Sequence, residues 1–331
     1  MQLMPTLHDA FRAHKRIKSI IRRTPVIASS DLAASTGARS LHLKLECLQV
    51  TGSFKVRGAA NKILSLTAEE REKGVITFST GNHGKAVAYV AGRLGLKAVV
   101  CLSEHVSPNR AEMIRALGAE ISIKGRSQDE AERNYRELIS ARDLVPVVPF
   151  DDAAIIAGQG TIALEILTDL ADADVLMVPL SGGGLLAGMA LVAKTINPEM
   201  RVVGISIERS PAMLESLKAG APVQVEERDT IAESLLGGIG LENRFTLPLV
   251  ARFVDEHVIV SEEQIKDGMY FVFDQHRLIV EGAAAVGIGA LLHRKVDVSG
   301  KKVAVLLSGS SIDSQSYVRV IDGRLAGGLK R

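Results

Sequence analysis

The sequence predicts an α/β protein with two lobes, each built on a mostly parallel sheet flanked by helices. From residue 74 onward, short apolar runs alternate with segments of helical spacing, as in GVITFST followed by GNHGKAVAYVAGRLG. Parallel strands need long crossover connections, and helices of this length supply them. The alternation restarts near residue 158, so we expect two successive blocks with a ligand cleft where strand ends meet.

The N-terminal region is expected to begin with an amphipathic helix over residues 6–22. Its apolar side would carry Leu7, Phe11, Ile17 and Ile20. A short strand is expected in RRTPVIAS and a brief helix in SSDLAASTG. Leucines alternate at 41, 43 and 45 and predict another strand, which Thr51-Gly52-Ser53 ends before helical spacing begins at Phe54.

The two α/β blocks hold the remaining elements. The first block has strands in KAVVCLS, AEISIKG and LVPVVPF, and helices in PNRAEMIRALG and SQDEAERNYRELIS. The second has helices in GQGTIALEILTDL, GGLLAGMALVAKTI and SPAMLESLKAG, and strands in DVLMVPL and RVVGISIE. Residues 221–250 are less regular and rich in glycine. A strand, two helices and a last strand in KKVAVLLSGS are expected after them.

Composition excludes several classes of function. The 331 residues are 47% hydrophobic, which is enough for one large or two modest cores. A net charge of +2 favours neither a nucleic-acid nor an acidic partner, and the absence of Trp argues against stacking surfaces for single strands. Cys47 and Cys101 sit in apolar runs and are expected to be buried rather than paired. No signal-peptide core or membrane-spanning run is present, so we expect a cytoplasmic protein.

Lys55 is the most informative residue, because it is predicted to lie in the first turn of a helix that Ser53 caps. A helix N-terminus carries partial positive charge and repels an ammonium group. A lysine held there has reason to lose its proton and to act as a nucleophile toward a carbonyl. The alternative is a solvated surface lysine on a helix that happens to begin at this point.

Two glycine-containing turns each join a strand to a helix. Ser181-Gly182-Gly183-Gly184-Leu185 would let backbone N–H groups converge on an anion at a helix N-terminus. Two alternatives are glycines that permit tight packing and a dinucleotide fingerprint running from Gly182 to Glu208, although that spacing is off by one. In 79–84, Asn82 could donate to a phenolate-like oxygen and free N–H groups could bind a carboxylate.

TGSFKVRGA at 51–59, FSTGNHGKA at 78–86 and SGGGLLAG at 181–188 together resemble the pyridoxal-phosphate (PLP) enzymes of the tryptophan-synthase-β fold type. Within that group the sequence is similar to the threonine dehydratase and serine racemase branch, from about Pro25 to Asp313. The resemblance implies a discontinuous large domain of residues 1–74 and 151–331 and a small domain of residues 75–150.

The resemblance also implies a role for each candidate residue around the cofactor. Lys55 would form the resting imine with PLP, and Asn82 would bond the ring hydroxyl. Ser308 would face the pyridine nitrogen, and Phe54 and Glu281 would lie near the ring. The phosphate would be held by Ser181, Gly182, Gly183, Gly184 and Leu185. Without the family, Phe54 is equally explained as core, Glu281 as a helix-dipole carboxylate, and Ser308 as the end of a buried strand.

Substrate contacts are implied at Ser79, Thr80, Asn82 and His83, which would hold a carboxylate. Read alone, His83 is more typical of a helix cap or a core histidine. The catalytic residues would be Lys55, as the base that removes the Cα proton, and Thr80. The implied enzyme is a lyase that eliminates water from a β-hydroxy amino acid to give a keto acid and ammonia. Alternatives are an amino-acid racemase, an NAD-dependent dehydrogenase and a non-catalytic binding protein.

Some positions depart from the family pattern. Thr80 stands where serine racemases have serine, Ser234 replaces a glycine beside the substrate, and residues 310–311 replace a Gly-Asn pair. These departures resemble the hydroxyectoine-utilisation dehydratases, so a hydroxyectoine-derived substrate is a further expectation. Ser206 and Ala212 stand where relatives have metal-binding carboxylates and Glu208 is out of register, so no divalent ion is expected. We also expect a homodimer and no regulatory domain responsive to isoleucine.

Overall fold

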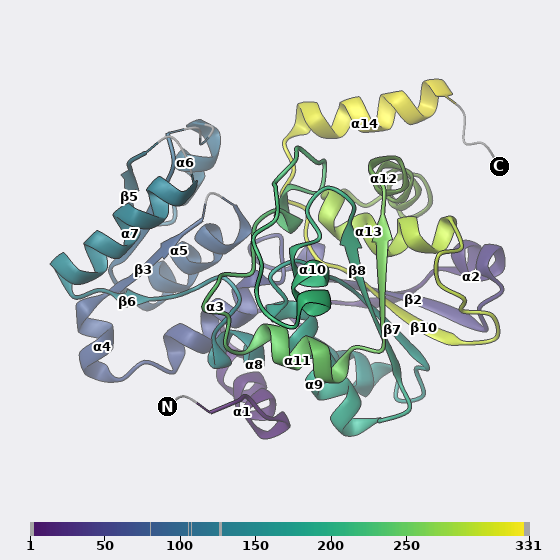
Figure 1. The fold of residues 1–331 in the computed structure, drawn as a ribbon, viewed down its shortest axis with the longest axis horizontal. Helices are drawn as coiled ribbons and strands as arrows, with labels where there is room; N and C mark the ends of the chain where they lie inside the picture. Colours follow the sequence, from purple (N-terminus) through teal and green to yellow (C-terminus); the bar gives the residue numbers. More distant parts are fainter. Residues whose placement is uncertain (1–2, 80, 105, 107, 126–127, 328–331) are drawn as a thin grey trace.

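Two separate sheets organise the computed structural model, which describes residues 3–79, 81–104, 106, 108–125 and 128–327 (Figure 1). In order across it, the larger sheet contains β1 (Val26–Ala28), β2 (Ser40–Leu45), β10 (Lys302–Leu307), β7 (Val175–Pro179), β8 (Arg201–Ile207) and β9 (Glu256–Val260). The smaller sheet contains β5 (Glu120–Ile123), β4 (Ala98–Leu102), β3 (Val75–Phe78) and β6 (Val145–Pro146). All neighbouring strands are parallel except β1 and β2, which confirms the predicted α/β fold.

Helices connect the strands and cover both sheets. In the first half of the described chain they are α1 (Leu7–Ile17), α2 (Ser30–Thr36), the 3₁₀ helix η1 (Glu46–Leu48), α3 (Lys55–Leu64), α4 (Ala68–Lys73), α5 (Asn82–Leu94), α6 (Pro108–Arg115), α7 (Gln128–Arg142) and α8 (Ala153–Asp169). In the second half they are α9 (Gly184–Ile196), α10 (Ala212–Ala219), the 3₁₀ helix η2 (Glu233–Leu235), α11 (Thr246–Phe253), α12 (Glu262–His276), α13 (Gly282–Leu292) and α14 (Ser314–Gly327).

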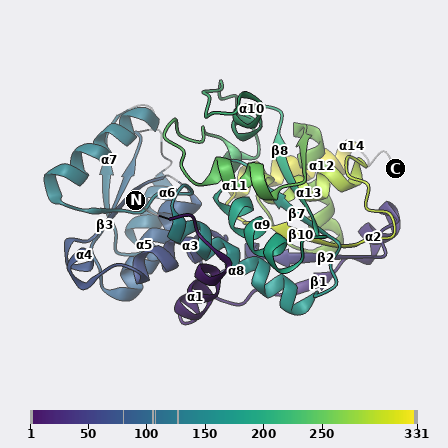
Figure 2. The same ribbon diagram turned by 60° about the horizontal axis from the view of Figure 1, so that its bottom comes forward.

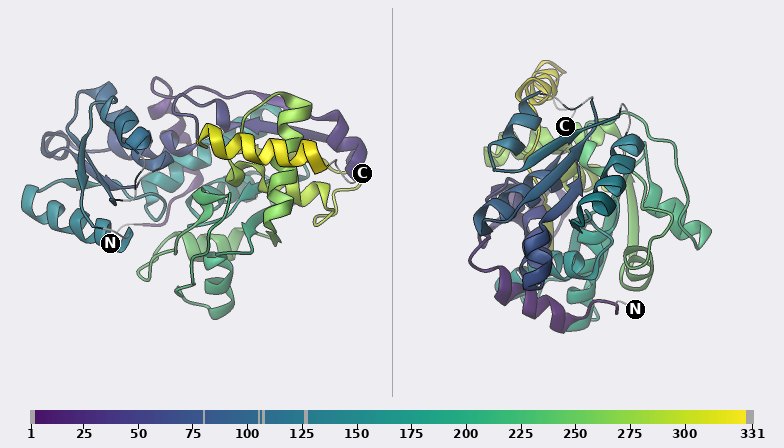
Figure 3. Two further views of the ribbon diagram at one scale, coloured as in Figure 1. Left: turned by 90° about the horizontal axis from the view of Figure 1, so that it is seen from above. Right: turned by 90° about the vertical axis from the view of Figure 1, so that its left-hand side faces the viewer.

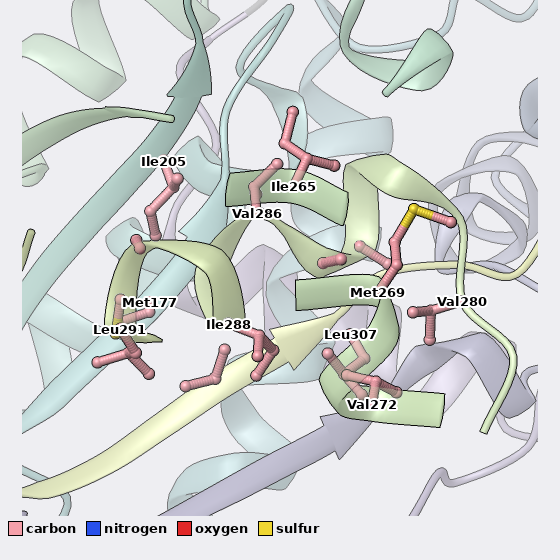
Figure 4. Packing of buried hydrophobic residues seen from close by; sticks show 14 of the residues in the cluster. Met177, Ile205, Ile265, Met269, Val272, Val280, Val286, Ile288, Leu291 and Leu307 are labelled. Atoms are coloured by element: carbon pink, nitrogen blue, oxygen red, sulfur yellow. The ribbon is translucent and has the colours of Figure 1, made fainter. Parts of the chain in front are cut away.

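The larger sheet is buried on both faces, as a parallel sheet with crossover helices requires. Along β7, Met177 joins one hydrophobic cluster, whereas Leu176 and Val178 join the other. Residues of α12 and α13 cover the Met177 face, where Val286 and Met269 pack in the cluster (Figure 4). Residues of α8, α9 and α11 cover the opposite face (Figure 2). Because β2, β10, β7, β8 and β9 are parallel, their carboxyl ends lie at one edge of the sheet.

The smaller sheet has a core of its own, at one end of the molecule (Figure 3). That core includes Val87 of α5 and Val100 of β4, and also Val56 of α3, Ile17 of α1 and Ile155 of α8. Helices that precede and follow residues 75–150 therefore share the core of the small lobe. The domain bounds given above stay a prediction.

Three sequence predictions were wrong in detail. The first helix ends at Ile17, and Phe11 is 52% exposed, because Ala10 and Ala13 form the buried side together with the predicted Ile17. The segment LVPVVPF pairs with β3 only over Val145–Pro146, since prolines lack the N–H that a ladder needs. Helix α8 begins at Ala153, five residues before the predicted stretch, because Asp152 caps it through N–H groups of the first turn.

Both cysteines are buried and unpaired, as predicted, and burial raises the pKa of Cys47 to about 12 and that of Cys101 to about 11. Neither thiol is therefore a reactive nucleophile at neutral pH. Within the part of the chain that the structure describes, none of the helices combines the length and the apolar composition that crossing a bilayer requires.

Candidate active site

The turn before Lys55 is fixed by contacts with the end of β10. Ser53 forms a backbone bridge with Gly309, and the N–H of Phe54 donates to the carbonyl of Ser308 at 3.0 Å. Helix α3 then begins at Lys55, so this lysine lies in the first turn of the helix as predicted. Ser53 is not its cap, which is a correction: Phe54 occupies the N-cap position and no side chain caps the helix. The Ser53 hydroxyl is buried without a partner among the described residues.

Ser310 explains one of the departures from the family pattern. Its hydroxyl donates to the carbonyls of Cys47 at 3.1 Å and Gly52 at 3.3 Å, and its N–H donates to the Gly52 carbonyl at 2.9 Å. Gly52 has φ +77°, in the left-handed region that favours glycine. Ser310 therefore supports the turn that leads to Lys55.

The Lys55 amine is enclosed by polar and aromatic groups. Nζ donates to the carbonyl of Pro149 at 2.9 Å and lies 5.3 Å from the centre of the Phe54 ring. The side chain is partly exposed, yet enough protein surrounds it that burial lowers the pKa of Lys55 to about 8, against a smaller upward effect of Glu281. About a tenth of this amine is neutral at pH 7, whereas an ordinary lysine is almost wholly charged.

Asn82, Ser234 and Glu281 meet where the two lobes face each other. Asn82 begins α5, Glu281 is the N-cap residue of α13, and Ser234 lies in η2. The Asn82 side-chain amide donates to both oxygens of Glu281, at 3.0 and 3.1 Å, and to the hydroxyl of Ser234 at 3.3 Å. The Glu281 side chain does not cap its own helix. The structure thus brings together three residues that are separated by up to 199 positions in the chain.

Burial raises the pKa of Glu281 to about 7, although hydrogen bonds from Asn82 and Ser234 and the Ser311 backbone oppose the shift. The folded protein therefore holds this proton more tightly than the unfolded chain, whose ordinary carboxyl pKa is 4.5. By linkage, this group contributes stability below pH 4.5 that is lost as the pH rises to about 7, and the full loss is roughly 3 kcal/mol.

Replacing Glu281 with Gln should remove that pH dependence. We measure the melting temperature of cofactor-free Glu281→Gln minus that of cofactor-free wild type. We expect this difference to increase from pH 5 to pH 8, because only the wild type must ionise a buried carboxyl. Thermal unfolding followed by circular dichroism at several pH values measures the difference. A difference between the two proteins that is constant across this range would contradict the raised pKa.

His83 is held neutral in the second position of α5. Burial, reinforced by the charge of Lys55, lowers the pKa of His83 to about 3. Nε2 lies 2.9 Å from the carbonyl of Val147, which can only accept, so Nε2 carries the proton and Nδ1 does not. Nδ1 is buried and has no partner among the described residues. Of the neighbouring predicted residues, Ser79 accepts from the N–H of Gly81 at 3.3 Å, and Thr80 lies outside the described residues.

The glycine loop lies directly after β7 and before α9. Gly183 is the N-cap residue with φ +87°, and no side chain caps α9, so the N–H groups of its first turn are free to bind an anion. A Cβ atom at Gly182 or Gly184 would lie 2.5 or 2.8 Å from Phe150. Because Phe150 follows Pro149, whose carbonyl accepts from Lys55, one short segment contacts both the loop and the amine.

Ser308 and Phe54 complete the predicted set. Ser308 is buried directly after β10, and its carbonyl binds the N–H of Phe54. The Phe54 ring packs against the hydrophobic cluster on the α8 and α9 side of the large sheet, so it belongs to the core as well as lying beside the amine. No sequence pattern indicated Pro149 or Phe150, because their contacts with Lys55 and the glycine loop are long-range.

The chemistry of these residues fits a cofactor that carries an aldehyde and a phosphate. A partly neutral lysine can bond to an aldehyde, and an uncapped helix N-terminus can bind a phosphate. Buried polar atoms without partners among the described residues lie nearby, at Ser53 Oγ, Asn82 Oδ1 and His83 Nδ1. The described residues contain no group of three or more His, Cys, Asp or Glu side chains arranged to hold a metal ion.

Comparison with known proteins agrees with this chemistry. Residues 17–309 match the family model described as pyridoxal-phosphate dependent enzyme. The chain is 44% identical over 318 residues to a putative threonine dehydratase of Sinorhizobium fredii, with 96% of each chain covered. It is 41% identical over 319 residues to an L-threonine ammonia-lyase of Thermotoga maritima, covering 96% of this chain and 79% of the relative. The structure of maize serine racemase superposes with a TM-score of 0.90 at 30% identity and covers 98% of this chain and 99% of that one.

The NAD-dependent dehydrogenase alternative rested on the Gly182–Glu208 spacing alone. The family match over most of the chain argues against it. The chain belongs to the family of pyridoxal-phosphate dependent enzymes, and its cofactor is pyridoxal phosphate.

Proposed function

We propose that this chain is an ammonia-lyase that eliminates water from a β-hydroxy amino acid and yields a keto acid and ammonia. The observation that carries the proposal is the contact of the Pro149–Phe150 segment with both the Lys55 amine and the glycine loop. The Lys55 amine, which can bond to an aldehyde, and the N–H groups of the glycine loop, which can bind a phosphate, therefore face the same site. The relatives named as a threonine dehydratase and an L-threonine ammonia-lyase support the choice of reaction.

Lys55 is proposed as the catalytic base. When bound, the pyridoxal group supplies an aldehyde for the substrate amine and a sink for the electron pair left at Cα. With a pKa near 8, the free Lys55 amine is neutral often enough at physiological pH to accept the Cα proton. The carbonyl of Pro149 holds Nζ by a hydrogen bond in the absence of substrate and so limits its rotation.

The substrate carboxylate is proposed to lie at the N-terminus of α5, against the residues predicted from the sequence, Ser79, Thr80, Asn82 and His83. A neutral His83 serves to position this helix end through Val147 rather than to transfer a proton, because its pKa is near 3. Ser308, a neutral hydroxyl, is proposed to face the ring nitrogen, Asn82 to bond the ring hydroxyl, and Glu281, which binds Asn82, to lie near the ring. The phosphate is proposed to bind residues 181–185.

Amino-acid racemisation is a second candidate, because the maize serine racemase covers nearly the whole fold. Racemisation and elimination share the removal of the Cα proton, and they differ in whether a β-leaving group departs or a proton returns to the opposite face. A product assay that measures both keto acid and the D-enantiomer separates the two.

The substrate proposal is tested by incubating the PLP-loaded protein with L-threonine, L-serine, 3-hydroxyaspartate and a hydroxyectoine-derived hydroxy amino acid. The keto acid and the ammonia should be released in equal amounts, and the release should be fastest for one of these substrates, since a β-hydroxyl is the leaving group.

The hydroxyectoine proposal rests on Ser234 and the other departures from the family pattern, and it fails if the hydroxyectoine derivative is the poorest of the four substrates. Alanine, which lacks the leaving group, is the control. D-amino acid without keto acid would favour the racemase. The homodimer and the cytoplasmic location stay predictions.

A further inference from the structure

Four charged side chains are sealed from solvent behind the helix that begins at Lys55. They come from four elements: Lys44 of β2, Glu46 of η1, Arg57 of α3 and Glu165 of α8. Their side chains are 0% exposed, except that of Glu165 at 2%. We call this set the Arg57 cluster. None of its members takes part in the reaction proposed above.

The Arg57 guanidinium binds two carboxylates at once. Toward Glu46, Nε and Nη2 donate at 2.8 Å to the two oxygens. Toward Glu165, Nη1 and Nη2 donate at 2.7 and 2.9 Å to the two oxygens. Lys44 donates to Glu165 at 2.6 Å and to the carbonyl of Thr24 at 2.7 Å. Two positive and two negative groups balance each other, and each of the carboxylate oxygens accepts at least one hydrogen bond.

Stability alone is a poor reason for this arrangement. Burying ions costs several kcal/mol each, and apolar side chains of the same volume are often as stable or more stable. Two carboxylates bound to one guanidinium instead restrict the orientation of the arginine side chain. The guanidinium is planar and its donors are fixed, so both carboxylates can be bound only within a narrow range of orientations. The Arg57 cluster therefore specifies the rotation and position of α3 more strictly than an apolar contact would.

The geometry of α3 relates the orientation of Arg57 to the position of the Lys55 amine. Arg57 follows Lys55 by two residues, which corresponds to about 200° of rotation around the helix. Anchoring Arg57 to Glu46 and Glu165 on one side of α3 therefore places Lys55 on the other side, where Nζ meets the Pro149 carbonyl. Glu46 also begins η1, a short helix that precedes the turn leading to Lys55, and its carbonyl accepts from the N–H of Gln49.

We propose that Glu46 and Glu165, with Lys44, act through Arg57 as positioning residues for the Lys55 amine. This inference rests on the proposed function only for the role of the amine as a base. The position of Nζ itself depends on neither cofactor nor substrate. A positioning role predicts that loosening the fork changes the properties of Lys55 itself and not merely the melting temperature.

The test is Arg57→Lys, which keeps the charge and loses the fork. In cofactor-free protein, Lys55 is labelled with acetic anhydride at a series of pH values, and mass spectrometry measures the rate. We expect a wild-type midpoint near pH 8 and a variant midpoint displaced by about one unit or more. In the PLP-loaded protein, kcat should fall roughly 10- to 100-fold, with a smaller change in KM. Glu120→Gln, at the exposed Arg142–Glu120 fork, is the matched control and should change neither value.

If Arg57→Lys does not fold, the charge-balanced Lys44→Met/Glu165→Gln protein replaces it, with the same expected displacement of the labelling midpoint. A variant that melts earlier but labels Lys55 with the wild-type pH profile and keeps the wild-type kcat would overturn the inference. The labelling requires neither cofactor nor substrate, so it can fail while the lyase proposal stands. Absence of keto-acid release from the wild type would fail the lyase proposal and leave the labelling result to decide this one.

Discussion

Lys55→Ala protein is expected to fold like wild type and to release keto acid at least 1,000-fold more slowly, an order of magnitude set by the loss of both a nucleophile and a general base. Lys55 begins α3, and among the described residues its Nζ donates to one group, the uncharged carbonyl of Pro149, so its removal breaks no salt bridge there. Alanine also favours helix formation at this position. Ammonia release measures the loss, and circular dichroism with thermal unfolding measures the fold.

A second amine provides the control. Burial also lowers the pKa of Lys85, and its Nζ lies near the turn at Gly52, 3.9 Å from where a Cβ atom there would be. Borohydride treatment of PLP-loaded wild type should bleach the visible colour and add the cofactor mass to a peptide containing Lys55. Lys85→Ala should still be labelled in this way, and Lys55→Ala should not. Cofactor fixed to Lys85, or activity that survives in Lys55→Ala, would remove Lys55 from the mechanism.

Much of this fold could be predicted because its signals are local. Apolar runs such as those of β7 and β8 are buried on both faces, and a strand buried on both faces reads as continuous apolar sequence. The position of Lys55 at the start of a helix followed from the Thr-Gly-Ser interruption before it. The amide–carboxylate contact of Asn82 with Glu281 could not be predicted from pattern, because it joins two lobes across 199 positions.

The errors have a common physical origin in tertiary contacts. Ser53 has the residue type of an N-cap, but its backbone bridges to Gly309, and that pairing takes it out of the capping position. Phe11 has helical spacing with Leu7, but close packing of α1 on its neighbours selects Ala10, Ala13 and Ile17 for the buried side. Arg57 and Glu165 belong to residue types that are rarely buried, and their complementary partners in the fold, which no local pattern shows, are what allows their burial.

The glycine loop offers the second large effect. Gly183→Ala is expected to weaken PLP binding at least about tenfold, which corresponds to roughly 1.4 kcal/mol. Gly183 has φ +87°, where a side chain is strained. A Cβ atom there would lie 2.6 Å from the Met213 methyl group and 2.9 Å from the Thr246 Cβ. Met213 can rotate away, but Thr246 is fully buried, and its hydroxyl and N–H are bonded to Asn243 and Asp151.

The loop must therefore move, and the first-turn N–H groups of α9 move with it. Fluorescence or absorbance titration of the cofactor-free protein with PLP measures the loss of affinity. Gly220→Ala separates this effect from backbone strain, because Gly220 has φ +70° at the end of α10 and a Cβ atom there would meet nothing within 4 Å. Both variants should lose about 1 kcal/mol of stability from the strained backbone, but only Gly183→Ala should lose affinity. Equal PLP affinity in both variants would place the phosphate away from residues 181–185, because a displaced loop cannot hold an anion as tightly as the native one.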